Sequence, residues 1–474
     1  MKRLLPAALV LALPSVAAAN GRIPTSVGIT YRSESDPILA AMTFGLLESK
    51  DGGRTYQWVC EQAIGITGDW DPQYVYYPGG KILATTPTKG VTISTDGGCT
   101  FTPAGDPVAG KSAWRMALSP DGQTVIVSTN STAKRNAVYL STDGATFRES
   151  AIFSDTRIFD WVEPVLSDPM RIYAGSLSMQ FDDPQLHVTK DGGRTATSFT
   201  IPEHDAHQIQ ILGATMASPD TVYVRLRVGA GGKLYKTTDG GATWAVIFEG
   251  TITAAAFDPP SDTLYVSGVR TGAGGSGGSG EVGGVLRSTD GGATWQMGAS
   301  DPRPRCFGFD AARNLYACTF NFGSALMARS TDRGNTFSPF LSVEPTMLTG
   351  PKCCPAGTPV HDMCEPLWAG LADQLGLGQG SRVACGSGGA GGAGAAGGMS
   401  GGGGMSGGGG AGGSSGNAGT GGSAGRAGNA GNAGTGGGGS SGGGGCATSD
   451  GSSSGALAPL FALLGLFALP RRRR

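Results

Sequence analysis

The stretch Ser-Lys-Asp-Gly-Gly-Arg-Thr-Tyr occupies residues 49–56 of this 474-residue chain, and variants of it recur as far as residue 337. The seven copies span Ser49–Tyr56, Ser94–Phe101, Ser141–Phe147, Thr189–Ala196, Thr238–Trp244, Ser288–Trp295 and Ser330–Phe337. Their aspartates, spaced 42 to 51 residues apart, are Asp51, Asp96, Asp143, Asp191, Asp239, Asp290 and Asp332. A period of about 40–50 residues indicates a repeat protein, and it suits one four-stranded sheet per repeat.

The motif has the chemistry of a tight turn. An Asp at its start accepts hydrogen bonds from backbone amides just ahead of it. The glycines supply positive φ without steric cost. The Thr hydroxyl ties the exit of the turn, and the aromatic residue that follows begins the next strand. Three copies depart from this pattern: the third lacks one Gly, the fourth has Ala196 at the aromatic position, and the last has Arg333 for the first Gly.

A second turn, rich in Asp, Ser and Pro, lies upstream of each motif and is followed by a short apolar run bounded by turn residues. These runs are Ile38–Met42, Ile82–Thr85, Val125–Ser128, Ile172–Gly175, Val222–Arg225, Leu264–Ser267 and Leu315–Cys318. They read as strands, so each repeat is expected to hold four strands joined by hairpins. We therefore predict an all-β fold, a seven-bladed β-propeller of four-stranded blades over residues 20–343.

The seven motifs resemble the Asp box, or BNR repeat, of sialidases, sortilin-type receptors and plant photosystem assembly factors. The resemblance implies that the seven aspartates are structural and lie in hairpins at the blade periphery, away from the ligand face. It also implies that ligand-binding residues belong to the loops on the opposite face.

Both ends of the chain carry export signals. Residues 1–19 have a basic start (Lys2, Arg3), an apolar stretch and Ala17-Ala18-Ala19 before Asn20, as in a secretory signal peptide. The alternative, a membrane anchor, is disfavoured by the length of the apolar stretch. Residues 386–445 are nearly all Gly, Ser, Ala and Asn, so we expect a disordered linker there.

Residues 446–474 form the tail. Cys446, which follows Gly445, precedes a polar spacer, the apolar run Ala456–Pro470 and Arg471–Arg474. This order of elements resembles the MYXO-CTERM sorting tail of myxobacterial surface proteins. The resemblance implies processing near Cys446 and attachment of the protein to the outer cell surface, with the membrane as a partner through the tail. The alternative is a plain C-terminal transmembrane helix.

Eight further cysteines form an even set, which in an exported chain favours disulfides: Cys60, Cys99, Cys306, Cys318, Cys353, Cys354, Cys364 and Cys385. Cys306 and Cys318 flank a hairpin and could face each other across two strands. Cys60 and Cys99 could join the first two repeats. The last four fall in residues 344–385, which we expect to form a small disulfide-stapled cap with one helical stretch, Glu365–Leu375. Zinc binding by these four is an alternative.

Aromatic residues beside carboxylates on the predicted loop face suit the recognition of sugars or peptides. The candidates are Asp69, Trp70, Asp71, Trp114, Arg115, Asp160, Trp161, Glu163, Glu203, His204, Asp205 and His207. The competing interpretation is that the Trp residues pack between blades and the acids cap turns. His204 and His207 could also hold a metal, but no third ligand is evident, so we predict no metal and no cofactor.

An enzyme of the sialidase type is the sharpest alternative. Arg22-Ile23-Pro24 resembles a motif near the N-terminus of sialidases, and Arg115 and Arg225 are further candidate arginines. Three arginines, a Tyr–Glu pair and an Asp are required, however, and no such set stands out. Other glycosidases need two carboxylates at a suitable separation. Without the predicted signal peptide and tail, 29 basic and 35 acidic residues remain, which argues against nucleic-acid binding.

We therefore expect an exported, surface-anchored monomer that binds a polysaccharide or protein without catalysis. A glycoside hydrolase that uses loop carboxylates is the second candidate.

Overall fold

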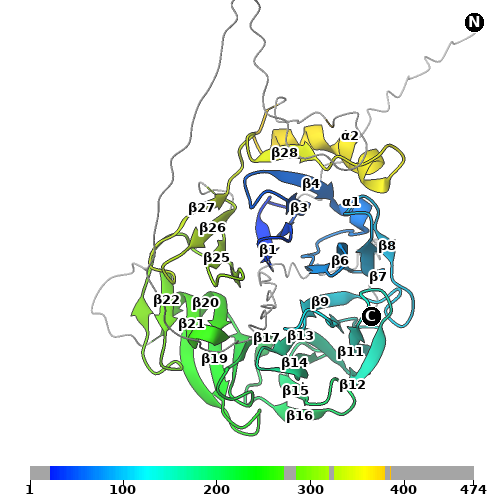
Figure 1. Ribbon diagram of the computed structural model, residues 1–474. Helices are drawn as coiled ribbons and strands as arrows, with labels where there is room; N and C mark the ends of the chain where they lie inside the picture. Colours follow the sequence, from blue (N-terminus) through cyan, green and yellow to red (C-terminus); the bar gives the residue numbers. More distant parts are fainter. Residues whose placement is uncertain (1–21, 32, 272–283, 320–324, 379–384, 386–474) are drawn as a thin grey trace, which may run out of the picture. The chain divides into compact units, whose positions relative to one another are not determined.

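The computed structural model describes residues 22–31, 33–271, 284–319, 325–378 and 385. In these residues the chain is mostly strand, and its sheets are arranged around a ring (Figure 1). The first sheet contains β1 (Ser26–Thr30), β2 (Ile38–Met42), β3 (Gly45–Ser49) and β4 (Tyr56–Cys60). The second contains β5 (Tyr74–Tyr77), β6 (Lys81–Thr86), β7 (Gly90–Ser94) and β8 (Thr102–Pro103).

The next two sheets also have four antiparallel strands each. One contains β9 (Ala113–Leu118), β10 (Val125–Thr129), β11 (Asn136–Ser141) and β12 (Arg148–Ser154). The other contains β13 (Arg157–Val165), β14 (Asp168–Ser178), β15 (Gln185–Thr189) and β16 (Thr197–Thr200). The last sheet around the ring contains β24 (Cys306–Phe309), β25 (Leu315–Cys318), β26 (Met327–Ser330) and β27 (Ser338–Leu341).

Between them lies a sheet of seven strands: β17 (Ala206–Ala214), β18 (Val222–Val228), β19 (Gly231–Thr237), β20 (Ala245–Asp258), β21 (Thr263–Arg270), β22 (Gly284–Ser288) and β23 (Gln296–Met297). Its 14-residue strand β20 pairs with β19 over residues 245–250 and with β21 over residues 250–258. One long strand is therefore the outermost strand of one four-strand group and the innermost strand of the next.

The innermost strands contact one another in cyclic order. β1 contacts β5, β5 contacts β9, β9 contacts β13, β13 contacts β17, and β17 contacts the inner part of β20; β20 then contacts β24, and β24 contacts β1. Radially arranged four-stranded antiparallel sheets that close in this way form a β-propeller. All seven apolar runs predicted from the sequence lie in the second strands of these groups.

Strands inside the ring are buried on both faces, because a neighbouring sheet packs against each side. Every residue of β10 and β11 is buried, although alternating strands are usual where one face of a sheet meets solvent. One core cluster joins Tyr77 and Leu83 of the second sheet to Val127 and Tyr139 of the third. The core is therefore a series of apolar layers between neighbouring sheets.

Each of the seven Asp motifs forms the hairpin between the third and fourth strands of its group. In the first copy, Asp51 Oδ1 accepts hydrogen bonds from Ser49 Oγ at 2.8 Å and from the amide of Thr55 at 2.9 Å. Asp51 Oδ2 accepts from Thr55 Oγ1 at 2.7 Å. In the shorter third copy, Asp143 Oδ1 accepts from the amides of Ala145 and Thr146, so the turn keeps its acceptor with one residue fewer.

These turns share an edge of the ring with the hairpins between first and second strands. The amide of Gly192, in the fourth Asp motif, donates to the carbonyl of Met170 at 2.8 Å. In the same way, the amide of Gly240 donates to the carbonyl of Asp220 at 2.9 Å. We call this side the Asp-turn edge; the connections between second and third strands lie at the other, which we call the loop edge.

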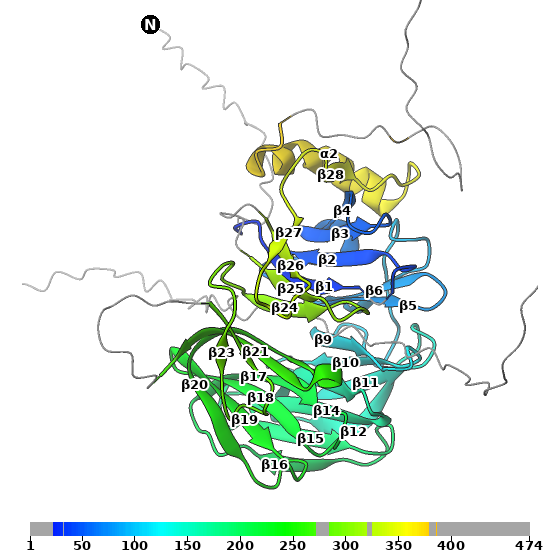
Figure 2. The same ribbon diagram turned by 60° about the vertical axis from the view of Figure 1, so that its left-hand side comes forward.

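The segment after the last repeat is joined to the first sheet. Strand β28 (Leu348–Pro351) pairs in parallel with β4, and helix α2 (Pro359–Gln374) packs beside both strands (Figures 1 and 2). The predicted helical stretch was too short at its start, since α2 begins six residues earlier than Glu365 with Pro359 in its first turn. Two shorter helical segments are α1 (Glu61–Ile64) and η1 (Pro259–Ser261).

Disulfides confirm one predicted pairing and correct the other. Cys306 and Cys318 are bonded across β24 and β25, as expected. Cys60 and Cys99 are not bonded to each other: Cys60 pairs with Cys364 and Cys99 with Cys354. The sequence could not reveal these pairings, because the two cysteines of each pair are far apart in the chain. The separation is 304 residues for Cys60 and Cys364 and 255 for Cys99 and Cys354, and only closure of the ring brings them together.

Cys353 and Cys385 are disulfide-bonded as well, so the four C-terminal cysteines have no thiolates for the zinc site considered above. The predicted signal peptide, linker and sorting tail with Gly445 and Cys446 lie outside the described residues. Within the described ranges, no helix is both long and apolar enough to cross a membrane.

Candidate functional site

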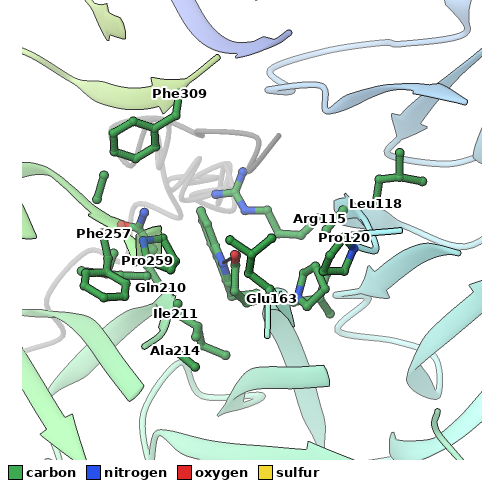
Figure 3. A pocket seen from close by; sticks show the side chains of 18 of the residues that line it. Arg115, Leu118, Pro120, Glu163, Gln210, Ile211, Ala214, Phe257, Pro259 and Phe309 are labelled. Carbon is green, nitrogen blue, oxygen red and sulfur yellow. Dashed lines mark hydrogen bonds between the residues drawn. The ribbon is translucent and has the colours of Figure 1, made fainter. Parts of the chain in front are cut away.

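A cavity lies at the centre of the ring, where innermost strands converge (Figure 3). Its volume is about 90 Å³, and β9, β13, β17, β20 and β24 supply most of its wall. The polar side chains on the wall are Gln73, Arg115, Glu163, Gln210 and Arg313. The remainder is largely apolar, which is the usual composition of a small-ligand site.

The cavity reaches the Asp-turn edge. Pro120, Pro259 and Arg313 belong to the turns that follow β9, β20 and β24, and all three line the cavity. Pro164 and Leu166, at the end of β13, line it too. The hollow part of the ring thus lies toward the edge that carries the Asp motifs, whereas the resemblance to Asp-box proteins directed attention to the opposite edge.

Four predicted candidates from neighbouring repeats form a row of three indole rings and one guanidinium. The rings of Trp70 and Trp114 meet edge to face with centroids 5.0 Å apart. The Arg115 guanidinium lies 5.2 Å from the Trp114 ring and 4.6 Å from the Trp161 ring. A guanidinium between two indoles gains cation–π attraction on both faces, so Arg115 is held in a defined position.

Asp160 lies next to this row and is 6% exposed. Its Oδ2 accepts a hydrogen bond from the amide of Ile209 on β17 at 3.1 Å. Burial raises the pKa of Asp160, while the positive charge of Arg115 opposes that rise. The carboxylate therefore links two sheets and balances Arg115, and it does not line the cavity.

Glu163 lies three residues beyond Asp160 along β13, and its side chain borders the cavity (Figure 3). Burial raises the pKa of its carboxyl to about 8, while a hydrogen bond from Trp161 Nε1, at 3.3 Å, partly offsets the rise. At neutral pH the carboxyl is thus mostly protonated and has an O–H to donate.

The arginines considered for a sialidase-like clamp do not meet. Arg22 donates to the carbonyl of Trp70 at 2.7 Å and pairs with Asp71. Arg225 donates to the carbonyl of Ile252 at 2.6 Å and to the Gln210 side chain at 3.3 Å. Both are therefore bound to groups of the chain itself, and Arg115 is stacked between indoles.

The remaining candidates lie elsewhere. Glu203 accepts hydrogen bonds from Lys233 at 2.7 Å and Tyr235 at 2.9 Å, while His204, Asp205 and His207 are exposed. Asp69 is exposed beside Arg22. None of these borders the cavity. Among the described residues, no cluster of three or more His, Cys, Asp or Glu side chains is arranged to hold a metal ion.

Sequence reasoning missed the apolar wall and three of its polar residues, Gln73, Gln210 and Arg313. Ile211, Leu212, Ala255 and Phe257 looked like ordinary core residues, because nothing in a strand pattern tells the channel side from the sheet-packing side. Their position in the repeat could have identified them, because they lie in its first strand, just ahead of the Asp-rich turn that leads to the second strand.

No protein-family model matches the chain, and no curated protein is similar to it. Solved structures do match. The extracellular domain of a one-component system from B. thetaiotaomicron is 12% identical with a TM-score of 0.43, over 63% of this chain and 38% of that one. YCF48 from Cyanidioschyzon merolae is 16% identical with a TM-score of 0.43, over 62% and 94%.

A GH74 xyloglucanase from Xanthomonas campestris is 13% identical with a TM-score of 0.33, over 72% of this chain and 66% of that one. The chain spans about two fifths of that extracellular domain and about two thirds of the xyloglucanase.

Proposed function

We propose that this chain is an exported seven-bladed Asp-box propeller that binds a polysaccharide or a protein in its central cavity, without catalysis. The seven blades are the five separate sheets and the two groups that share β20, each with one Asp turn. The Asp turns hold the hairpins, since their carboxylates are engaged by amides and hydroxyls of the same turn.

The observation that carries the proposal is the cavity itself. Arg115, Trp161 and Glu163, which the sequence nominated from two different repeats, meet at one hollow in the ring centre. A mainly apolar wall with a few fixed polar groups is what a binding site for part of a larger ligand requires. Rigid strands hold these groups, so little ordering is needed on binding.

One observation favours the second candidate, a glycoside hydrolase. A carboxyl with a pKa of about 8 stays protonated at neutral pH, as a general acid must. Hydrolysis by the usual routes also requires a second carboxylate about 5–10 Å away. Among the described residues of the cavity wall, Glu163 is the single carboxyl group, and this supports binding over hydrolysis.

A glycan array and a peptide library, read beside a hydrolysis screen on the same glycans, test the proposal. We expect binding to one ligand class and no released reducing ends. A matched pair of variants assigns the result: Glu163→Gln in the cavity and Glu203→Gln at its ion pair with Lys233. Hydrolysis that disappears in Glu163→Gln and persists in Glu203→Gln would establish the enzyme instead.

The disulfides are those of an exported protein. We further propose that the tail holds it at the outer cell surface, with Cys446 as the point of attachment. Replacing Cys446 with Ser should then move the protein from the cell-surface fraction to the medium. Unchanged retention of this variant would contradict the attachment while leaving ligand binding unaffected.

A further inference from the structure

Charges at the cavity are balanced within the chain. Arg115 faces the buried Asp160, and Arg313 Nε donates to Asp258 Oδ1 at 2.7 Å. The third ionisable group of the wall, Glu163, is mostly uncharged at neutral pH. A charged ligand group would therefore lose its hydration and meet no uncompensated counter-charge, which disfavours its binding. An uncharged group is the better occupant.

The size and polarity of the cavity further limit which ligand groups could occupy it. One water position needs about 10–15 Å³, so a cavity of about 90 Å³ takes roughly six to nine non-hydrogen atoms. Ile211, Leu212 and Phe257 offer apolar surface on one part of the wall. The Glu163 carboxyl, which is mostly protonated at neutral pH, offers an O–H donor, and its Oε2 accepts from Trp161 Nε1. Such a site suits one small group with a methyl and a carbonyl.

We propose that this cavity binds the N-acetyl group of an amino sugar in a polysaccharide that approaches from the Asp-turn edge. The methyl packs against the apolar wall, and the carbonyl oxygen accepts a hydrogen bond from Glu163. The remainder of the polymer stays outside, beside Pro120, Pro259 and Arg313. This inference rests on the proposed binding function and names its ligand class and its entrance.

An N-acetyl group meets all three conditions together. It is uncharged, it adds only about three to four non-hydrogen atoms to a sugar ring, and it carries an acceptor opposite a donor. A plain sugar hydroxyl would leave the apolar wall without a partner, so it gains less from burial. A free amine would bring a positive charge that the wall does not compensate.

Titration calorimetry with the full chain at pH 7 tests the inference. The probes are the β-1,4-linked tetramers of N-acetylglucosamine, of glucosamine and of glucose. We expect the N-acetylated tetramer to bind at least tenfold more tightly than the other two, and Glu163→Leu to remove that preference. Glu203→Gln, away from the cavity, is the matched control and should keep it.

The location is tested without a variant by ¹⁵N-labelled tryptophan. The Trp161 indole N–H donates to Glu163, so its resonance should shift on binding. Trp244 and Trp295, which belong to Asp turns at the periphery, should not respond. A shift confined to Trp70 would overturn the Asp-turn entrance, because Trp70 does not line the cavity.

Equal affinity for the N-acetylated and glucose tetramers would overturn the inference and leave polysaccharide binding intact. Failure of every oligosaccharide, together with binding of a peptide, would overturn both the inference and the polysaccharide branch of the proposed function.

Discussion

Arg333 stands where the other six Asp motifs have a glycine. All seven residues at this position adopt a left-handed backbone, with φ between 59° at Arg333 and 76° at Gly240. This conformation costs an L-residue about 1–2 kcal/mol, and it is not strained for glycine. The hydrogen bonds of the Asp332 turn are still formed, so the network holds Arg333 in the strained region.

Exchanging residues at this position should therefore change stability in opposite directions. We expect Arg333→Gly to raise the free energy of unfolding by about 0.5–1 kcal/mol, after the entropic cost of glycine is subtracted. Gly52→Ala should lower it by about 1 kcal/mol, since a Cβ there meets no atom within 4 Å and backbone strain alone remains.

Gly105→Ala is the matched control for urea denaturation, because Gly105 has equally open space and no positive φ. An Arg333→Gly variant less stable than the parent would show that its side chain contributes more than the strain costs.

Glu163 should make stability depend on pH. Its pKa is about 8 in the folded chain against an ordinary value of 4.5, so between these values the folded state keeps a proton that the unfolded state releases. The free energy of unfolding therefore falls as pH rises through this window.

Glu163→Gln removes this titration, so its stability relative to the parent should rise from pH 5 to pH 8 and level off above that. Denaturation midpoints at four pH values measure it. If the difference in stability between Glu163→Gln and the parent did not change with pH, the Glu163 carboxyl would be well hydrated in the folded chain.

At the scale of elements, the segment 348–374 acts as a clasp on the first two sheets. β28 extends the first sheet by pairing with β4, and Trp368 of α2 lies 5.7 Å from Trp58 of β4. The disulfides Cys60–Cys364 and Cys99–Cys354 tie the same segment to the first and second sheets. Strand and disulfides together connect the end of the ring to its beginning.

Removing a clasp disulfide should cost more than removing the hairpin disulfide. Cys60 and Cys364 are 304 residues apart and Cys306 and Cys318 are 12 apart. Because Cys99–Cys354 remains, the shortest path along the cross-linked chain from Cys60 to Cys364 runs 39 residues to Cys99 and 10 residues from Cys354. In the chain-entropy account, this longer loop adds about 1 kcal/mol of stabilisation. Thermal unfolding of the two double alanine variants compares them, and all four side chains are buried, so cavity effects are similar. A larger loss in the Cys306/Cys318 variant would contradict the clasp.

For the whole molecule, the segment 348–374 belongs to the folding unit, so this unit extends beyond residue 343. A boundary at residue 343, as the repeat period suggests, would remove β28 and α2 and leave the edge of β4 and the Trp58 ring without cover. A chain ending at residue 385 keeps both.

Fragments 20–343 and 20–385 should thus behave differently. We expect 20–385 to be monodisperse with a cooperative thermal transition, and 20–343 to unfold at least 10 °C lower or to aggregate, since it loses β28 and both disulfides that tie the C-terminal segment to the first two sheets. Calorimetry and size-exclusion chromatography provide the comparison. If the two fragments had equal thermal midpoints, under reducing and under oxidising conditions alike, the folding unit would end at residue 343.

The sequence by itself determined the repeat, the Asp turns and the position of the second strand in every group. These depend on local chemistry: an acceptor, glycines at positive φ and short β-branched runs. It also nominated Trp70, Trp114, Arg115, Asp160, Trp161 and Glu163, among twelve candidate residues of the predicted loop face.

Only the tertiary structure decided that the first and last sheets are joined by β28, that Cys60 and Cys99 pair with the C-terminal segment, and that the hollow of the ring lies toward the Asp-turn edge. Each of these is a relation between residues far apart in the chain. Their positions are fixed by closure of the ring, and local pattern carries no record of it.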